Sequence, residues 1–170
     1  MTVIRLTINQ KPIDLDPPGN RLLIETLRDE LHLTGTHSGC DTSQCGACLV
    51  LIDGQSVKSC SVFTGELDGA AITTIEGLAA IDNFGEGDSP LGRIQTAFQQ
   101  YHGLQCGFCT SGMVISASEL LATTPHPTEA EIRHWLEGNI CRCTGYQNII
   151  AAIMAAATGS GTGEGGESHV

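Results

Sequence analysis

Basic side chains are scarce in this chain. Its 170 residues include eight Lys and Arg against nineteen Asp and Glu, which gives a formal net charge of −11 at pH 7. No basic stripe is available to meet phosphates, and repulsion from a phosphate backbone makes nucleic acid an unexpected partner. The acidic surface is interpreted first as a solvated one, with a docking role for some of the acids left open.

Long apolar runs are missing as well. No stretch approaches the ~18 apolar residues that a helix needs to cross a bilayer, so no transmembrane segment is expected. Residues Met1 to Thr7 alternate polar and apolar types and have no basic region ahead of an apolar stretch, unlike a secretory signal. A cytoplasmic location is therefore expected.

Cysteine, by contrast, is plentiful, with eight residues. The cytoplasm keeps disulfides reduced, and a chain of this length can fold without them, so metal or redox chemistry is the expected use. The cysteines divide into two quartets with none left over: Cys40, Cys45, Cys48 and Cys60, then Cys106, Cys109, Cys141 and Cys143.

The first quartet reads C-x4-C-x2-C with a fourth cysteine further on, which is the spacing of plant-type [2Fe–2S] ferredoxins. Three ligands would come from one tight loop, and Cys60 would approach from the returning strand of a hairpin. Gly39 and Gly46 would let the backbone bend so that its N–H groups face the sulfurs and offset their negative charge. The alternative is a structural zinc site, which usually pairs two close knuckles.

The second quartet reads C-x2-C, a long gap, then C-x-C. Cys106 and Cys109 alone could be a thioredoxin-type redox pair, but that pair is expected after a strand, and here it lies between helical patterns. Placing both pairs at facing helix ends uses all four thiolates, because the positive N-terminal ends stabilise an anionic cluster. Two clusters in one chain would form an electron relay.

The first part of the chain has the pattern of a mixed sheet crossed by one helix. Leu23, Leu27 and Leu31 recur at helical spacing after Asn20, a plausible cap. Alternating apolar residues and the turn at Asp53 predict strands, including a hairpin that ends with Cys60. The predicted strands cover 4–8, 13–15, 49–52, 56–60 and 71–75.

Beyond a Gly- and Asp-containing linker, the apolar period becomes helical. Ser89 and Pro90 predict a helix start, and Thr128 with Glu131 forms a capping-box pattern. The expected helical stretches are 91–101, 113–121, 129–138 and 146–157, which suggests a small bundle. The Gly-, Ser- and Glu-rich residues 158–170 are too poor in apolar groups to pack and are expected to be disordered.

Three stretches together resemble the iron–sulfur subunit of molybdenum hydroxylases, the family of xanthine oxidase and aerobic carbon monoxide dehydrogenase. They are Gly39–Cys48, Gln105–Cys109 and Asn139–Tyr146, and the resemblance runs in order through residues 3–157. Leu33–His37 and Ser56–Cys60 resemble in particular the bacterial three-subunit members, including carbon monoxide and nicotine dehydrogenases.

The resemblance implies an α+β fold with one [2Fe–2S] cluster in each of two domains. An N-terminal ferredoxin-like β-grasp domain would span 1–76 and a linker 77–90. A C-terminal four-helix bundle, the helical [2Fe–2S]-binding domain, would span 91–157 ahead of the tail at 158–170. Ser111 departs from the family, which usually has proline there, and a small change in helix stability is expected.

The resemblance also implies partners. Electrons would pass from a molybdenum-pterin cofactor, on a large subunit, through the second quartet and then the first to FAD on a medium subunit. The complex would be a dimer of heterotrimers, and Gln105 would contact the pterin. The chain has no G-x-G-x-x-G fingerprint for FAD and would not be catalytic alone.

Two other functions compete with this one. The chain could be a stand-alone two-cluster ferredoxin that serves several enzymes, or a zinc-stabilised interaction module. A stand-alone ferredoxin would be a monomer, whereas a hydroxylase subunit would co-purify with two larger chains. A zinc module would be colourless, whereas ferric–thiolate clusters are reddish brown. In this family the substrate binds in the molybdenum subunit, so these residues do not select a substrate or a final electron acceptor.

Overall fold

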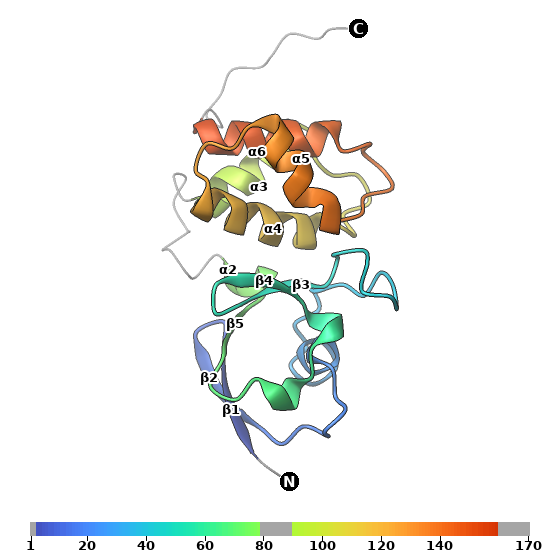
Figure 1. Cartoon of the computed structure of the whole chain (residues 1–170), viewed down its shortest axis with the longest axis vertical. Helices are drawn as coiled ribbons and strands as arrows, with labels where there is room; N and C mark the ends of the chain where they lie inside the picture. Colours follow the sequence, from blue (N-terminus) through green and yellow to red (C-terminus); the bar gives the residue numbers. More distant parts are fainter. Residues whose placement is uncertain (1–2, 79–89, 160–170) are drawn as a thin grey trace, which may run out of the picture.

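The computed structural model describes residues 3–78 and 90–159. The linker expected over 77–90 and the tail expected over 158–170 therefore lie largely outside the described residues. Within the described ranges the chain forms a sheet-containing half followed by a helical half, which stack along the long axis of the molecule (Figure 1).

A five-stranded mixed sheet forms the first half, in the order β2-β1-β5-β3-β4. β1 pairs parallel with β5, and the other neighbouring strands are antiparallel. The strands are β1 (Ile4–Ile8), β2 (Lys11–Leu15), β3 (Leu49–Ile52), β4 (Gln55–Lys58) and β5 (Ala71–Thr73). Strands are thus confirmed in all five predicted regions.

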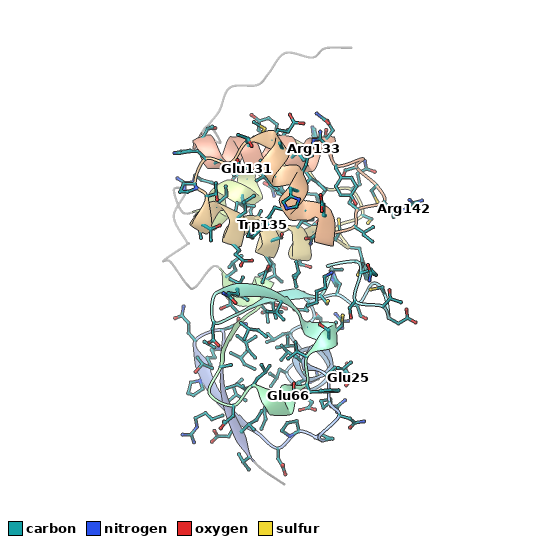
Figure 2. All side chains as sticks on the ribbon, in the orientation of Figure 1. Glu25, Glu66, Glu131, Arg133, Trp135 and Arg142 are labelled. Atoms are coloured by element: carbon teal, nitrogen blue, oxygen red, sulfur yellow. The ribbon has the colours of Figure 1, made fainter. Side chains whose placement is uncertain are left out.

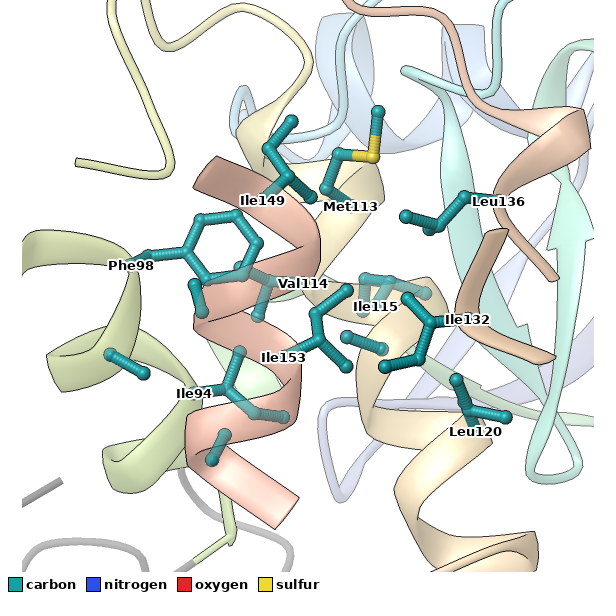
Figure 3. Close-up of a cluster of buried hydrophobic side chains, with 14 of the residues drawn as sticks. Ile94, Phe98, Met113, Val114, Ile115, Leu120, Ile132, Leu136, Ile149 and Ile153 are labelled. Atoms are coloured by element: carbon teal, nitrogen blue, oxygen red, sulfur yellow. The ribbon is translucent and has the colours of Figure 1, made fainter. Parts of the chain in front are cut away.

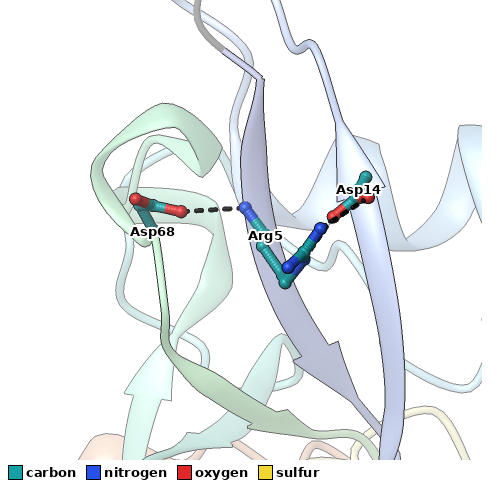
Figure 4. A network of polar contacts seen from close by, with 3 residues as sticks. All are labelled: Arg5, Asp14 and Asp68. Carbon is teal, nitrogen blue, oxygen red and sulfur yellow. Dashed lines mark hydrogen bonds and ion pairs between the residues drawn. The ribbon is translucent and has the colours of Figure 1, made fainter.

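Strand β1 shows the predicted alternation of buried and exposed residues. Ile4, Leu6 and Ile8 are buried, while the intervening side chains face outward. The Arg5 guanidinium pairs with the Asp14 carboxylate of β2 at 2.7 Å (Figure 4). This pair is exposed to solvent, so it contributes little to stability, and the buried face of the strand carries the packing.

The helix that crosses the sheet is short. It begins as α1 (Leu23–Glu25) and continues as one π-helical turn, η1 (Thr26–Glu30). Leu23 and Leu27 are fully buried, as their spacing predicted. The prediction of Asn20 as the cap was wrong, because Leu22 forms a β-bridge with Phe63 and so stays extended at the cap position.

The hairpin of β3 and β4 turns at Asp53 and Gly54, both with positive φ, as the Asp-Gly pair predicted. The prediction that Cys60 lies on the returning strand was wrong by a few residues. β4 ends at Lys58, and Cys60 sits in the 3₁₀ turn η2 (Ser59–Ser61). The buried Ser59 hydroxyl donates to the Cys48 carbonyl oxygen at 2.7 Å, which fixes the turn against the first cysteine loop.

The remaining elements are mostly helical. After the 3₁₀ turn η3 (Thr64–Glu66) and β5 they are α2 (Ile75–Leu78), α3 (Pro90–Gln100), α4 (Thr110–Thr123), α5 (Glu129–Trp135), the 3₁₀ turn η4 (Leu136–Gly138) and α6 (Gln147–Thr158). The capping box that opens α5 is confirmed, since Thr128 and Glu131 exchange hydrogen bonds. α3 packs against α4 and α6, and α5 packs against α4 and α6.

The helices surround one apolar core (Figure 3). Its fully buried large side chains include Ile94, Phe98, Met113, Ile115, Ile132, Ile149 and Ile153. Leu49 and Leu51 of β3 belong to this core, whereas Val50 belongs to the core beneath the sheet. β3 is therefore packed on both faces and joins the two halves.

No helix within 3–78 or 90–159 is long and apolar enough to cross a membrane.

Candidate metal centres

The first cysteine quartet lies between η1 and the end of the β3–β4 hairpin. Cys40, Cys45 and Cys48 occupy the loop that leads into β3, and Cys60 faces them from η2. The Cys48 and Cys60 sulfurs are 3.3 Å apart. The Cys45 backbone N–H donates to the Cys40 sulfur at 3.5 Å, and the side chains of these two residues interact. The four sulfurs thus meet as two pairs.

Backbone N–H groups surround one sulfur of this loop. Those of Cys45, Thr42 and Gln44 point at Cys40 and lower the pKa of its thiol to about 6. Cys48 is buried, and desolvation raises the pKa of its thiol to about 11. The N–H groups favour an anionic sulfur, so they would equally offset the negative charge of a bound cluster.

A positive charge also lies beside this loop. The Lys58 ammonium, at the end of β4, donates to the carbonyl oxygens of Ser43 at 2.9 Å and Gln44 at 3.4 Å. These bonds fix the segment between the first two cysteines to the hairpin. They also place a full positive charge against the loop that carries three of the cysteines, where it would stabilise the negative charge of a bound cluster.

Two glycines, Gly39 and Gly46, flank cysteines of this loop where a side chain would not fit well. A Cβ at Gly39 would lie 3.1 Å from the Cys45 sulfur, so a larger residue there would crowd the ligand. Gly46 has a φ of 72°, which is left-handed backbone that glycine adopts without strain. The structure therefore favours glycine at both positions, at Gly39 because of space and at Gly46 because of backbone conformation.

The second quartet is split between two loops of the helical half. Cys106 and Cys109 precede α4, and Cys141 and Cys143 precede α6. The Cys106 and Cys143 sulfurs are 3.4 Å apart, and the side chains of Cys109 and Cys141 interact. This quartet too is gathered in two pairs.

We predicted that both cysteine pairs lie at facing helix ends. This holds for Cys109 of the first pair and is wrong for the second pair, Cys141 and Cys143. Cys109 is the N-cap of α4. Cys141 and Cys143 lie in an irregular loop, because Gly145 and Tyr146 adopt left-handed backbone and α6 begins only at Gln147.

This quartet has a buried side and an open side. Burial raises the pKa of the Cys109 thiol to about 12, whereas the Phe108 backbone N–H lowers that of the exposed Cys106. Cys143 is exposed as well, and Arg142 beside it projects away from the helices (Figure 2). Exposed apolar side chains flank this edge: Leu104, Phe108 and Ile140.

Gln105 is exposed on the open side, directly before Cys106. It is therefore available to a neighbouring molecule that covers this edge. Gln44, before Cys45, is also exposed, and its side-chain amide donates to the Thr42 carbonyl oxygen at 3.3 Å.

Sequence patterns missed the roles of Tyr146 and His37. The Tyr146 hydroxyl accepts a hydrogen bond from the Cys141 N–H at 2.9 Å and donates to the Asn139 carbonyl oxygen at 3.2 Å. The His37 ring stacks on Phe108 with centroids 4.7 Å apart, and its Nδ1 lies 2.8 Å from the Phe108 carbonyl oxygen. His37 and Phe108 are 71 residues apart, so no local signal pointed to their contact.

The donor sets suit [2Fe–2S] clusters, in which each iron takes two protein thiolates. Within the described residues, no three His, Cys, Asp or Glu side chains gather as ligands of one metal ion. The sulfurs meet two by two instead. The buried Thr110 hydroxyl, next to Cys109, has no hydrogen-bond partner among the described residues and could donate to a sulfur of a bound cluster.

Two family models match the chain. A 2Fe-2S iron-sulfur cluster binding domain matches residues 6–77, and a [2Fe-2S] binding domain matches 74–154. The gamma subunit of caffeine dehydrogenase from Pseudomonas sp. (strain CBB1) is 44% identical over 156 residues, covering 90% of this chain and 89% of that subunit. The chain belongs to the iron–sulfur small subunits of the molybdenum hydroxylases.

Another small subunit and two solved structures also match this chain. The small subunit of nicotine 6-hydroxylase from Paenarthrobacter nicotinovorans is 43% identical, with 85% of this chain and 88% of that one covered. In the crystal structure of quinoline 2-oxidoreductase from Pseudomonas putida 86, a matching chain has a TM-score of 0.83 and 40% identity, with 94% and 95% covered. Aldehyde oxidoreductase from Desulfovibrio gigas matches with a TM-score of 0.81 and 39% identity, over 17% of its longer chain.

Proposed function

We propose that this chain relays electrons, one at a time, from a molybdenum cofactor through two [2Fe–2S] clusters to FAD, with both of those cofactors on partner subunits. Membership of the small-subunit family makes electron transfer its general role. The observation that supports the two-cluster relay is that both cysteine quartets gather their sulfurs in pairs, and that the loop of Cys45 touches the loop of Cys141.

Each quartet would hold one cluster. Cys40, Cys45, Cys48 and Cys60 would bind the first, in a ferredoxin-like β-grasp domain over 1–76. Cys106, Cys109, Cys141 and Cys143 would bind the second, in a four-helix bundle over 91–157. When bound, each cluster supplies a centre that accepts and releases a single electron. The paired sulfurs, the N–H groups around Cys40 and the Lys58 ammonium support this assignment.

The open edge of the second quartet suits the molybdenum subunit. Cys106, Cys143 and Gln105 are exposed there, among apolar side chains that a partner surface would cover. The first quartet would then face the FAD subunit, in a dimer of heterotrimers. A cytoplasmic location, where thiols stay reduced, completes the proposal.

Metal analysis of anaerobically purified protein tests the cluster content. Two clusters require about four iron and four acid-labile sulfide per chain. About two irons would contradict the two-cluster proposal, and stoichiometric zinc would favour an interaction module instead.

Isolation of the chain tests whether it transfers electrons without oxidising the substrate itself. The purified chain should take up electrons from dithionite but oxidise no substrate, and the native protein should co-purify with two larger chains. Substrate turnover by the chain alone would refute the subunit assignment. A native monomer with both clusters would favour a stand-alone ferredoxin.

The direction of the relay is tested by two matched glutamines. Gln105→Ala should slow reduction of the clusters by substrate, or weaken retention of the molybdenum cofactor, because a lost hydrogen bond costs about 1 kcal/mol or more. Gln44→Ala should leave the molybdenum half-reaction nearly unchanged. Stopped-flow reduction of the two variant holoenzymes by substrate measures this difference. If Gln105→Ala behaves like wild type while Gln44→Ala is impaired, the assignment of which cluster faces molybdenum is reversed.

A further inference from the structure

The loops of the two quartets contact each other through their main chains. The Ile140 N–H, directly before Cys141, donates to the Cys45 carbonyl oxygen at 2.9 Å. The Asn139 side-chain amide, which is 4% exposed, donates to the Gly46 carbonyl oxygen at 3.4 Å. The first loop thus lies directly against the segment that carries the last pair of cysteines.

The first turn of α4 presses on the same loop from another side. A Cβ at Gly112 would overlap the Gly46 carbonyl oxygen and would lie 3.1 Å from the Ala47 Cα. A Cβ at Gly46 would in turn overlap the Gly138 carbonyl oxygen. The obstructing atoms are backbone, which cannot rotate away as the end of a flexible side chain can.

These contacts lie next to cysteines on both sides. Gly46 follows Cys45, Gly112 follows Cys109 within the first turn of α4, and Asn139 shortly precedes Cys141. A displacement at any of them would therefore move one quartet relative to the other.

We propose that Gly112 and Asn139 are positioning residues that set the separation of the two clusters, and thereby the rate at which an electron passes between them. This proposal rests on the proposed function, since it requires both clusters. In the step, one electron leaves one reduced cluster and reduces the other, and no bond forms or breaks. Gly112 allows the close approach, and Asn139 ties the loops together.

The packing behind α4 transmits any change at Gly112. Met113 in the same turn is fully buried in the helical core, which also contains Leu49 and Leu51 of β3. A close-packed core leaves α4 no free space to absorb an added methyl group. The addition would therefore be relieved by separating α4 from the first loop.

The test compares Gly112→Ala with Gly138→Ala in the full chain within its native complex. Gly138 lies at the same junction, but a Cβ there would meet only the Lys58 ammonium, at 3.9 Å. In wild-type protein with both clusters reduced, magnetic interaction should split their electron paramagnetic resonance signals, and this splitting falls steeply with distance. Gly112→Ala should lose part of the splitting and transfer electrons between clusters more slowly, with unchanged iron and sulfide. Gly138→Ala should match wild type.

Asn139→Ala provides a second variant if Gly112→Ala assembles poorly. It adds no steric clash and removes the tie to Gly46, so the splitting should again decrease while iron is retained. Unchanged splitting in the iron-replete variants would overturn the proposal. So would loss of iron from both variants, because these residues would then serve cluster assembly and not spacing. Wild-type protein without two clusters would instead refute the proposed function.

Discussion

Replacing Tyr146 by phenylalanine removes one hydroxyl that serves two backbone groups. That hydroxyl accepts from the Cys141 N–H at 2.9 Å and donates to the Asn139 carbonyl oxygen at 3.2 Å. The ring is half-buried, and both Asn139 and Cys141 are buried. Tyr146→Phe keeps the ring and leaves the two main-chain groups without their partner.

The size of the effect follows from these two bonds. A hydrogen bond contributes about 1 kcal/mol net, and more where its partner stays buried, so the variant should lose about 2 kcal/mol of unfolding free energy. For a chain of this length, about 2 kcal/mol corresponds to a fall of about 4–8 °C in the unfolding temperature. The backbone at Tyr146 has a φ of 70°, and the substitution leaves that conformation as it is.

Urea unfolding of the iron-loaded full chain, followed by circular dichroism and by cluster absorbance, measures this loss. Tyr101, the other tyrosine of the chain, is 40% exposed and provides the control Tyr101→Phe. If Tyr146→Phe is as stable as Tyr101→Phe, the hydroxyl does not hold the second cysteine loop and the reasoning is wrong.

Three further predictions concern charge and capping. Lys58→Met should lower the reduction potential of the first cluster, on the order of tens of millivolts, because it removes a positive charge that is bonded to the first cysteine loop; equal shifts in a redox titration of the exposed control Lys11→Met would contradict this. Thr128→Ala should reduce unfolding free energy by about 0.5–2 kcal/mol, since it removes the cap of α5, and a urea midpoint equal to wild type would refute it. The Thr128 N–H and hydroxyl lower the pKa of Glu131, so its stabilisation should be complete above its unfolded-state pKa and lost as the pH falls through the lower folded-state pKa. Glu131→Gln should reduce the fall in unfolding temperature at acid pH, and an unchanged dependence of the unfolding temperature on pH would argue against the capping contact.

Local patterns predicted most of the fold. Alternation identified β1, the Asp-Gly pair identified the β3–β4 turn, and the Thr128–Glu131 box identified the start of α5. Each of these signals depends on residues close in sequence. The errors came where a distant segment decides the local structure, as when the bridge to Phe63 keeps Leu22 extended.

Sequence also predicted only part of the candidate site. Cysteine spacing grouped Cys40, Cys45 and Cys48, because a tight loop brings its own ligands together, whereas Cys60 and the second quartet meet across separate segments. Spacing could not predict that Tyr146 supports Cys141 through its hydroxyl, because that contact depends on the left-handed backbone of Gly145 and Tyr146. Nor could it predict that Gly112 meets Gly46, since that contact depends on how the two halves dock. Neither Tyr146 nor Gly112 carries a sequence signal for the role that its contact gives it.

The two-faced packing of β3 bears on how the halves could be exchanged between relatives. The family models divide the chain near residue 75, as if the halves were modules. Leu49 and Leu51, however, complete the apolar core of the second half while belonging to the first. A hybrid that joins the sheet of one relative to the helices of another would need matched side chains on β3, or it would bury a cavity or a clash at the junction. The two halves are therefore constrained to vary together at this strand.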